Sequence, residues 1–202
     1  MATIAEARDN DTGNHIKRTQ HYVELLANSL KHHPDFSAQL TEANIQLLVK
    51  SAPLHDIGKV GIPDSILLKP GPLTTEEFQI MKQHTIIGKN AIHTAENSLG
   101  EHNVFLRYAH EIAYCHQEKW DGSGYPQGLE GNDIPLSARL MSLADVYDAL
   151  RCRRAYKEPI EHEETVNIIK NSSGEHFDPR VVEALLQNSA EFASIAEQLK
   201  DH

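Results

Sequence analysis

The chain has 202 residues, of which 40% are hydrophobic and 6% aromatic, and its net charge is −10. This length suits one domain with a sizeable core, and the composition favours helices packed with Leu, Ile and Ala over a β-sandwich. The acidic balance excludes a broad basic surface for duplex nucleic acid. An anionic ligand therefore has to be held by local positive charge.

Helical periodicity dominates the sequence. Apolar residues three and four apart predict a helix over residues 13–31 and another over 42–57, which Pro53 kinks and Gly58 ends. Further helices are predicted over residues 75–96, 103–118, 136–152, 162–171, 179–188 and 190–200.

Two segments resist helix assignment. Residues 60–73 hold three prolines, and residues 121–135 hold four of the eleven glycines. Thr74 and Glu77, just after the first segment, have the spacing of a capping box. No stretch alternates apolar and polar residues convincingly, so we expect an all-α fold. Long irregular loops in a compact domain are usually functional or disordered, and the motif in the second one favours function.

Other counts bear on location and chemistry. No signal peptide and no apolar run of membrane length are recognisable, so we expect a cytoplasmic protein with no membrane insertion. Cys115 and Cys152 form neither a metal-type spacing nor a disulfide framework. The 13 histidines are far more than a chain of this length usually carries, which favours metal binding.

Three blocks rich in imidazole and carboxylate groups lie at the edges of apolar segments: His55–Lys59, His116–Pro126 and Ala144–Ala149. Such groups are costly to bury unless a cation neutralises them, so a metal cluster is expected. Adjacent residues on a helix do not share a face. His55 and Asp56 can therefore converge on one ion only where the backbone is irregular; taken alone, the pair equally suits a surface salt bridge.

In this order the three blocks resemble the HD-GYP family, which comprises metal-dependent phosphodiesterases that open cyclic dinucleotides. The resemblance covers about residues 8–188. It implies one HD-type helical bundle over residues 1–202, with a loop that carries Gly124-Tyr125-Pro126. Because the first motif lies close to Met1, we expect a catalytic domain excised from a longer regulatory protein.

The resemblance also implies a site. Mixed imidazole and carboxylate ligands suit two divalent ions, Fe or Mn before Ni or Zn. A bridging carboxylate would hold the pair, and a metal-bridging hydroxide would attack phosphorus in line. Lys59 is expected to neutralise a phosphate oxygen, which makes Asp56 and Lys59 the predicted catalytic residues. The predicted metal ligands are His15, His55, Asp56, His84, His116 and Asp145.

Two positions depart from the family pattern, and both are candidates for an additional metal shell. Asp11 stands where members with three metals have Glu; the shorter side chain puts a third metal in doubt, and Asp11 equally suits a helix cap. Gln117 replaces the second His of a His-His-Glu block, and its amide oxygen is a weak ligand. This leaves open a weaker second metal site or a degenerate member.

Substrate contacts are expected from Arg139, Tyr125 and Lys157. Each has a structural alternative: an ion pair for Arg139, loop packing for Tyr125, and charge at a helix C-terminus for Lys157. Glu118 and Asp148 are expected to hold ligand imidazoles by hydrogen bonds, with capping or helix stabilisation as the alternative.

The expected function is hydrolysis of one phosphodiester of cyclic di-GMP or 3′,3′-cyclic GMP-AMP to a linear dinucleotide. No residue that reads guanine or adenine can be picked out. One alternative is a catalytically weak or inactive module that binds a cyclic dinucleotide or a protein partner. Another is a general HD-type nucleotide phosphohydrolase, against which the Gly-Tyr-Pro loop argues. The expected partners are the cyclic dinucleotide and a regulatory domain or signalling protein.

Overall fold

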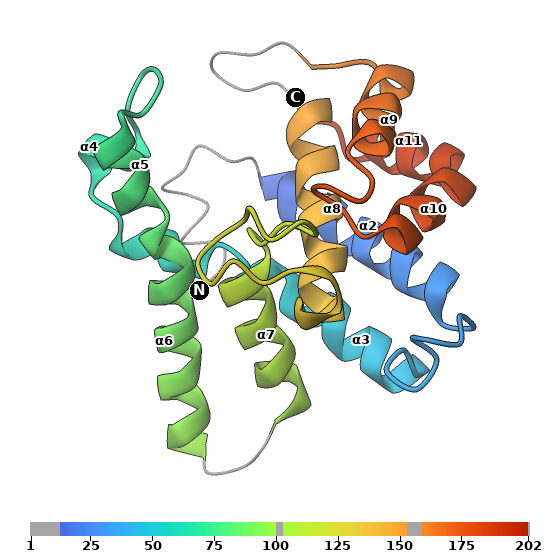
Figure 1. The fold of residues 1–202 in the computed structure, drawn as a ribbon, viewed down its shortest axis with the longest axis horizontal. Coiled ribbons are helices and arrows are strands. Elements are labelled where there is room, and N and C mark those ends of the chain that lie inside the picture. The colour runs from blue at the N-terminus through green and yellow to red at the C-terminus, as the bar shows by residue number, and fades with distance from the viewer. Residues whose placement is uncertain (1–12, 100–102, 153–158, 202) are drawn as a thin grey trace.

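The computed structural model describes residues 13–99, 103–152 and 159–201, which form helices and no strand (Figure 1). The expected all-α fold is confirmed. None of the described helices is long and apolar enough to cross a membrane. The α-helices are α2 (Gly13–Leu30), α3 (Glu42–Ser51), α4 (Asp64–Leu67), α5 (Thr75–Met81), α6 (Gln83–Leu99), α7 (Val104–Cys115), α8 (Leu136–Arg151), α9 (His162–Asn171), α10 (Pro179–Gln187) and α11 (Ser189–Gln198). Three short 3-10 helices are η1 (Ala52–Leu54), η2 (Ile57–Gly61) and η3 (Gly131–Asp133).

Helices α2 and α8 form the middle of the molecule (Figure 1). α2 packs against α3, α8, α10 and α11, while α7 packs against α3, α6 and α8. The core between them is aromatic at its centre, where Tyr22 stacks on Phe192 with ring centroids 4.6 Å apart. Tyr147 meets both rings edge-on. All three side chains are buried, and full burial of a large apolar side chain contributes about 1.5–3 kcal/mol.

The predicted helix over 42–57 was too long, because α3 ends at Ser51. Pro53 has no N–H to donate to the carbonyl of Val49, and that carbonyl accepts a bond of 3.0 Å from the Gln20 amide instead. The chain continues as η1 and η2, with the turn that holds His55 and Asp56 between them. The irregular backbone expected at this pair is therefore present.

The predicted helix over 75–96 is two helices. Its capping box is present, since Thr74 accepts from the N–H of Glu77 and the Glu77 carboxylate accepts from that of Thr74. The break follows Met81, whose carbonyl accepts a 2.8 Å bond from Nδ1 of His84. His84 thus lies in the first turn of α6, and not in the middle of a helix as its sequence position suggested.

The other predicted helices match those observed within a few residues, including α10 with Asp178 as N-cap and Pro179 at its first position. Residues 60–73 are less irregular than expected, because they contain the end of η2 and the single turn of α4. Ile62, Ile66 and Leu67 bury this turn against Met81 of α5 and Ile87 of α6. Residues 121–135 remain a loop apart from η3.

Candidate metal centre

Four buried imidazoles are held in the same way, through their Nδ1 atoms. The partners are the Asp148 carboxylate for His15 (2.8 Å), and the carbonyls of Ala52 for His55 (3.0 Å), Met81 for His84 (2.8 Å) and Ile112 for His116 (2.9 Å). Each such bond requires the hydrogen on Nδ1. In the neutral ring Nε2 then carries the lone pair, which is the form that binds a metal ion.

One cluster forms around Asp56. Its Oδ1 lies 3.4 Å from Nε2 of His84 and 3.6 Å from Nε2 of His116. Atoms about 2.1 Å from a common ion are about 3.4 Å apart in a tetrahedral arrangement. These three side chains therefore have the spacing of three ligands of one metal ion, and the helix ends of α6 and α7 place two of them.

A second cluster lies beside the first. Nε2 of His15 is 3.5 Å from Nε2 of His55 and 3.8 Å from Oδ1 of Asp145. The clusters meet at Asp56, whose other oxygen, Oδ2, is 3.3 Å from Nε2 of His55. One carboxylate thus presents one oxygen to each cluster, as a ligand that bridges two ions does. All six predicted ligands are brought together.

The polar atoms of the centre fit a cation. Oδ1 of Asp56 and Nε2 of both His84 and His116 are buried, and within the described residues they have no hydrogen-bond partner. Buried polar atoms without a partner are rare and costly. Imidazole nitrogen and carboxylate oxygen are ligands of divalent transition metals, so bound ions would satisfy the three atoms.

The pKa values of these groups also indicate a buried negative charge that a cation would neutralise. Burial lowers the pKa of His84 to about 4, so its ring is neutral near pH 7. Burial acts in the same direction on His55, but Asp56 and Asp145 outweigh it and raise that pKa to about 9. Burial would raise the pKa of Asp56, yet Lys59 and His55 hold it well below its usual range. The Asp56 carboxylate is therefore charged and attracts cations.

Gly58 lets the turn after Asp56 touch α6. An added Cβ at this residue would lie 1.8 Å from the His84 carbonyl oxygen and 2.5 Å from the Gly88 nitrogen. At Gly88 itself the nearest atoms are 3.3 Å away, so the tight approach belongs to Gly58. This contact is what places Asp56 beside His84.

A family model described as an HD domain matches residues 1–181. The chain belongs to the HD-domain family. It is 57% identical over its whole length to a cyclic di-GMP phosphodiesterase of Vibrio cholerae, and 41% identical to a 3′3′-cGAMP-specific phosphodiesterase of the same organism. The chain spans 41% and 36% of the lengths of these two relatives.

Solved structures agree on the fold of this HD-domain chain. A cyclic GMP-AMP-specific phosphodiesterase of V. cholerae superposes with a TM-score of 0.61 at 19% identity, covering 98% of this chain and 49% of its own. An HDGYP protein of Bdellovibrio bacteriovorus gives 0.58 at 20% identity, covering 88% of this chain and 53% of its own. The expected HD-type helical fold is confirmed.

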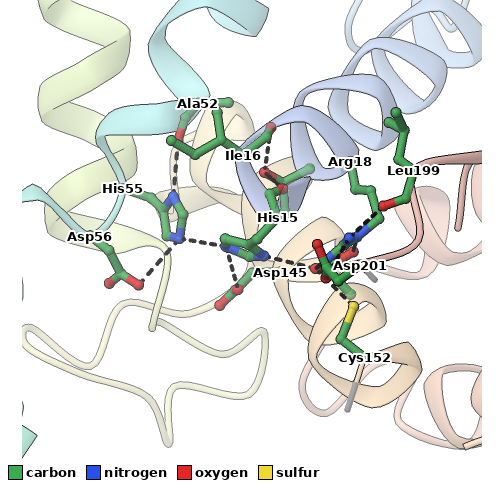
Figure 2. A network of polar contacts seen from close by, with 12 residues as sticks. His15, Ile16, Arg18, Ala52, His55, Asp56, Asp145, Cys152, Leu199 and Asp201 are labelled. Atoms are coloured by element: carbon green, nitrogen blue, oxygen red, sulfur yellow. Dashed lines mark hydrogen bonds and ion pairs between the residues drawn. The ribbon is translucent and has the colours of Figure 1, made fainter. Parts of the chain in front are cut away.

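The HD-domain centre also contains a residue that the sequence did not single out. Arg18 is 1% exposed and donates from Nε to Oδ1 of Asp148 at 2.6 Å and from Nη2 to Oδ2 at 3.0 Å. Asp148 in turn accepts from His15, as expected for a residue that holds a ligand imidazole. Figure 2 shows Arg18 beyond His15, next to Leu199 and Asp201. Its spacing from His15, three residues along one helix, was the available signal.

Two expected roles are not those observed. Glu118 is buried and accepts from the backbone N–H groups of Gln127, Gly128 and Leu129, so it anchors the loop and holds no ligand imidazole. Arg139 is also buried and pairs with Asp178 at 2.7 Å, so it makes an ion pair with a partner that the sequence did not indicate and is not an open phosphate contact.

Of the remaining candidate site residues, three lie in the described part of the chain and two do not. Tyr125 lies edge-on to the His84 ring, with centroids 6.4 Å apart. Nζ of Lys59 is 2.7 Å from Oδ2 of Asp56. The backbone carbonyl of Gln117 accepts from the N–H of Tyr125 at 3.1 Å. Asp11 and Lys157 lie outside the described residues.

Proposed function

We propose that this HD-domain chain is a metal-dependent phosphodiesterase that hydrolyses a cyclic dinucleotide to a linear one. The observation that carries the proposal is the pair of His/Asp clusters joined through Asp56. Two adjacent ligand sets that share one carboxylate are the arrangement of two-metal hydrolytic sites. We propose His15, His55 and Asp145 as ligands of one ion, and His84 and His116 as ligands of the other.

When bound, a pair of divalent ions supplies Lewis-acid activation of water and of the phosphodiester. The chain supplies the rest. Asp56 orients both sites, and four Nδ1 bonds hold the imidazoles at fixed angles. Lys59 brings an ammonium group to the edge of the centre, where we propose that it stabilises negative charge developing on a phosphate oxygen. The ligands are nitrogen and oxygen without thiolate, which favours Fe or Mn over Zn.

Two aromatic rings and an ammonium group next to His84 are suited to binding a nucleotide. Phe78 is 45% exposed, and its ring meets that of Tyr125 edge-on with centroids 6.1 Å apart. Nζ of Lys82 lies 5.4 Å from the Phe78 centroid and 5.6 Å from that of Tyr125. In a chain of net charge −10, aromatic rings and an ammonium beside the metal centre are suited to a base and its phosphate.

We propose cyclic di-GMP as the first substrate to test, because the relative named for it shares 57% identity, against 41% for the one named for 3′,3′-cyclic GMP-AMP. The test is product analysis after Mn- or Fe-loaded protein is incubated with each compound separately. Hydrolysis of either supports the phosphodiesterase, and the ratio of rates identifies the preferred substrate. Binding of metal without product from either contradicts the proposal and favours a binding module, for which Gln117 is the sequence argument.

A further inference from the structure

Arg18 joins the metal centre to the C-terminal segment. On one side it makes the two bonds to Asp148, whose Oδ2 also accepts from Nδ1 of His15. On the other side its Nη1 donates to the carbonyl of Leu199 at 2.8 Å and to Oδ2 of Asp201 at 2.9 Å. The network shown in Figure 2 therefore runs without a break from the end of α11 to a proposed metal ligand.

Because this network is buried, the loss or shift of one member is not compensated by solvent. The side chains of Arg18 and Asp148 are each 2% exposed, so neither charge has water to replace a lost partner. Removing one member of a buried pair leaves an uncompensated charge. Because one carboxylate serves both Arg18 and His15, a shift of the guanidinium moves the oxygen that fixes the His15 ring.

We propose that Arg18 is a positioning residue for the metal centre, and that the C-terminal segment controls how tightly Arg18 holds Asp148. Arg18 holds Asp148 in the orientation that aims Nε2 of His15 at the cluster with His55 and Asp145. Leu199 and Asp201 hold Arg18. A change at the C-terminal segment is thus transmitted to one ligand set and not to the other, since His84 and His116 are fixed by carbonyls of their own neighbourhoods. This inference assumes that the clusters bind cations, but not which substrate they serve.

Arg151 provides a matched control. It also ties the body of the protein to the C-terminal region, donating to the Ile160 carbonyl at 2.8 Å and to Glu197 at 3.1 Å. Its side chain is 10% exposed, and within the described part of the chain neither Ile160 nor Glu197 has a hydrogen bond or ion pair with a proposed metal ligand. Losing Arg151 loosens the same region without reaching His15.

The experiment is a calorimetric titration of Mn²⁺ alone into metal-stripped protein, which gives the affinity and the number of bound ions. The melting temperature of each variant is measured as well. Arg18→Gln is expected to weaken one of two Mn²⁺ sites by about 10- to 100-fold, the usual effect of removing a group that supports a ligand. The other site keeps its affinity. Arg151→Gln is expected to lower the melting temperature while both sites bind as in the parent.

Two further variants keep the test decisive if Arg18→Gln folds poorly. Arg18→Lys keeps the charge without the planar fork and is expected to recover part of the lost affinity. Asp201→Asn leaves Asp148 paired and is expected to weaken the same site by less than about tenfold. Normal binding of both ions in the Arg18 variants overturns the proposal, and so does equal weakening by Arg151→Gln. An Asp201→Asn protein that binds like the parent overturns the C-terminal coupling. A parent that binds no Mn²⁺ overturns the whole inference, whereas failure on cyclic dinucleotides alone leaves this test unaffected.

Discussion

The close contact at Gly58 makes a sharp prediction about how the centre is built. In Gly58→Ala the new methyl group would lie 1.8 Å from the carbonyl oxygen of His84. Carbon atoms pack against their neighbours at about 3.5 Å, so the turn and α6 have to separate by more than about 1 Å. Both obstructing atoms, this oxygen and the Gly88 nitrogen, belong to backbone, so no rotamer change relieves the overlap.

The expected cost follows from this overlap. Overpacking a filled interior costs about 1–3 kcal/mol, and a clash with backbone belongs at the upper end. For a chain of this size, about 3 kcal/mol lowers the melting temperature by about 6–12 °C. Metal–ligand distances tolerate only about 0.2 Å, so a separation of about 1 Å between Asp56 and His84 should also remove the ion of that cluster.

The assay is thermal unfolding together with metal content after loading with Mn²⁺. Gly61→Ala is the matched control, because it lies in the same 3-10 helix and the three atoms nearest to its added methyl are side-chain atoms of Ile87, at 3.0 Å or more. A Gly58→Ala protein that keeps its melting temperature and both ions would refute the reasoning. Equal loss in Gly61→Ala would show that the helix, and not the contact, is sensitive.

Three more predictions follow from the loop, the aromatic pair and a buried acid. Glu118→Gln removes the charge that accepts three backbone N–H groups and should cost about 1–3 kcal/mol in urea unfolding, with faster hydrogen exchange in the loop it anchors. Phe78→Ala should raise KM for a cyclic dinucleotide by about tenfold or more, whereas Ile80→Ala, exposed on the same helix, should not. Burial would raise the pKa of Asp178, but its bonds to Arg180 and Arg139 outweigh that and lower it. The pairing therefore stabilises the fold above about pH 4 and is lost below it, and Asp178→Asn should flatten the fall in unfolding free energy between pH 5 and pH 3.

The six residues named as ligands lie together in the structure, whereas the bounds of the helices that carry them were predicted less well. Imidazole and carboxylate groups at apolar edges indicated a metal, and the resemblance to the HD-GYP family then named six ligands without any knowledge of their helices. The ends of those helices depend on hydrogen bonds from distant residues, which cannot be read from the sequence. Pro53 indicated a kink, but the end of α3 at Ser51 also needs the Gln20 amide to satisfy the carbonyl of Val49.

The residues that hold the ligands and the loop in place were predicted less well, because their hydrogen bonds and ion pairs join residues that are distant in the sequence. Glu118 was expected near an imidazole, yet its carboxylate serves N–H groups about ten residues along the chain. Arg139 lies 39 residues from Asp178, and nothing in either motif indicated the pair. Arg18 contacts residues 130 and more positions away, which periodicity within one helix cannot reveal.

The four proposed ligand histidines differ in how their rings are oriented. His55, His84 and His116 each bond through Nδ1 to a carbonyl three or four residues earlier, at the place where a helix ends or begins. The carbonyls of Ala52 and Ile112 also accept the backbone N–H of the same histidine, so the local course of the chain at a helix end orients these rings. His15 instead bonds through Nδ1 to Asp148, 133 residues away. Its cluster therefore relies on the packing of α2 against α8 and on Arg18, and it is the part of the centre that changes elsewhere in the molecule can reach.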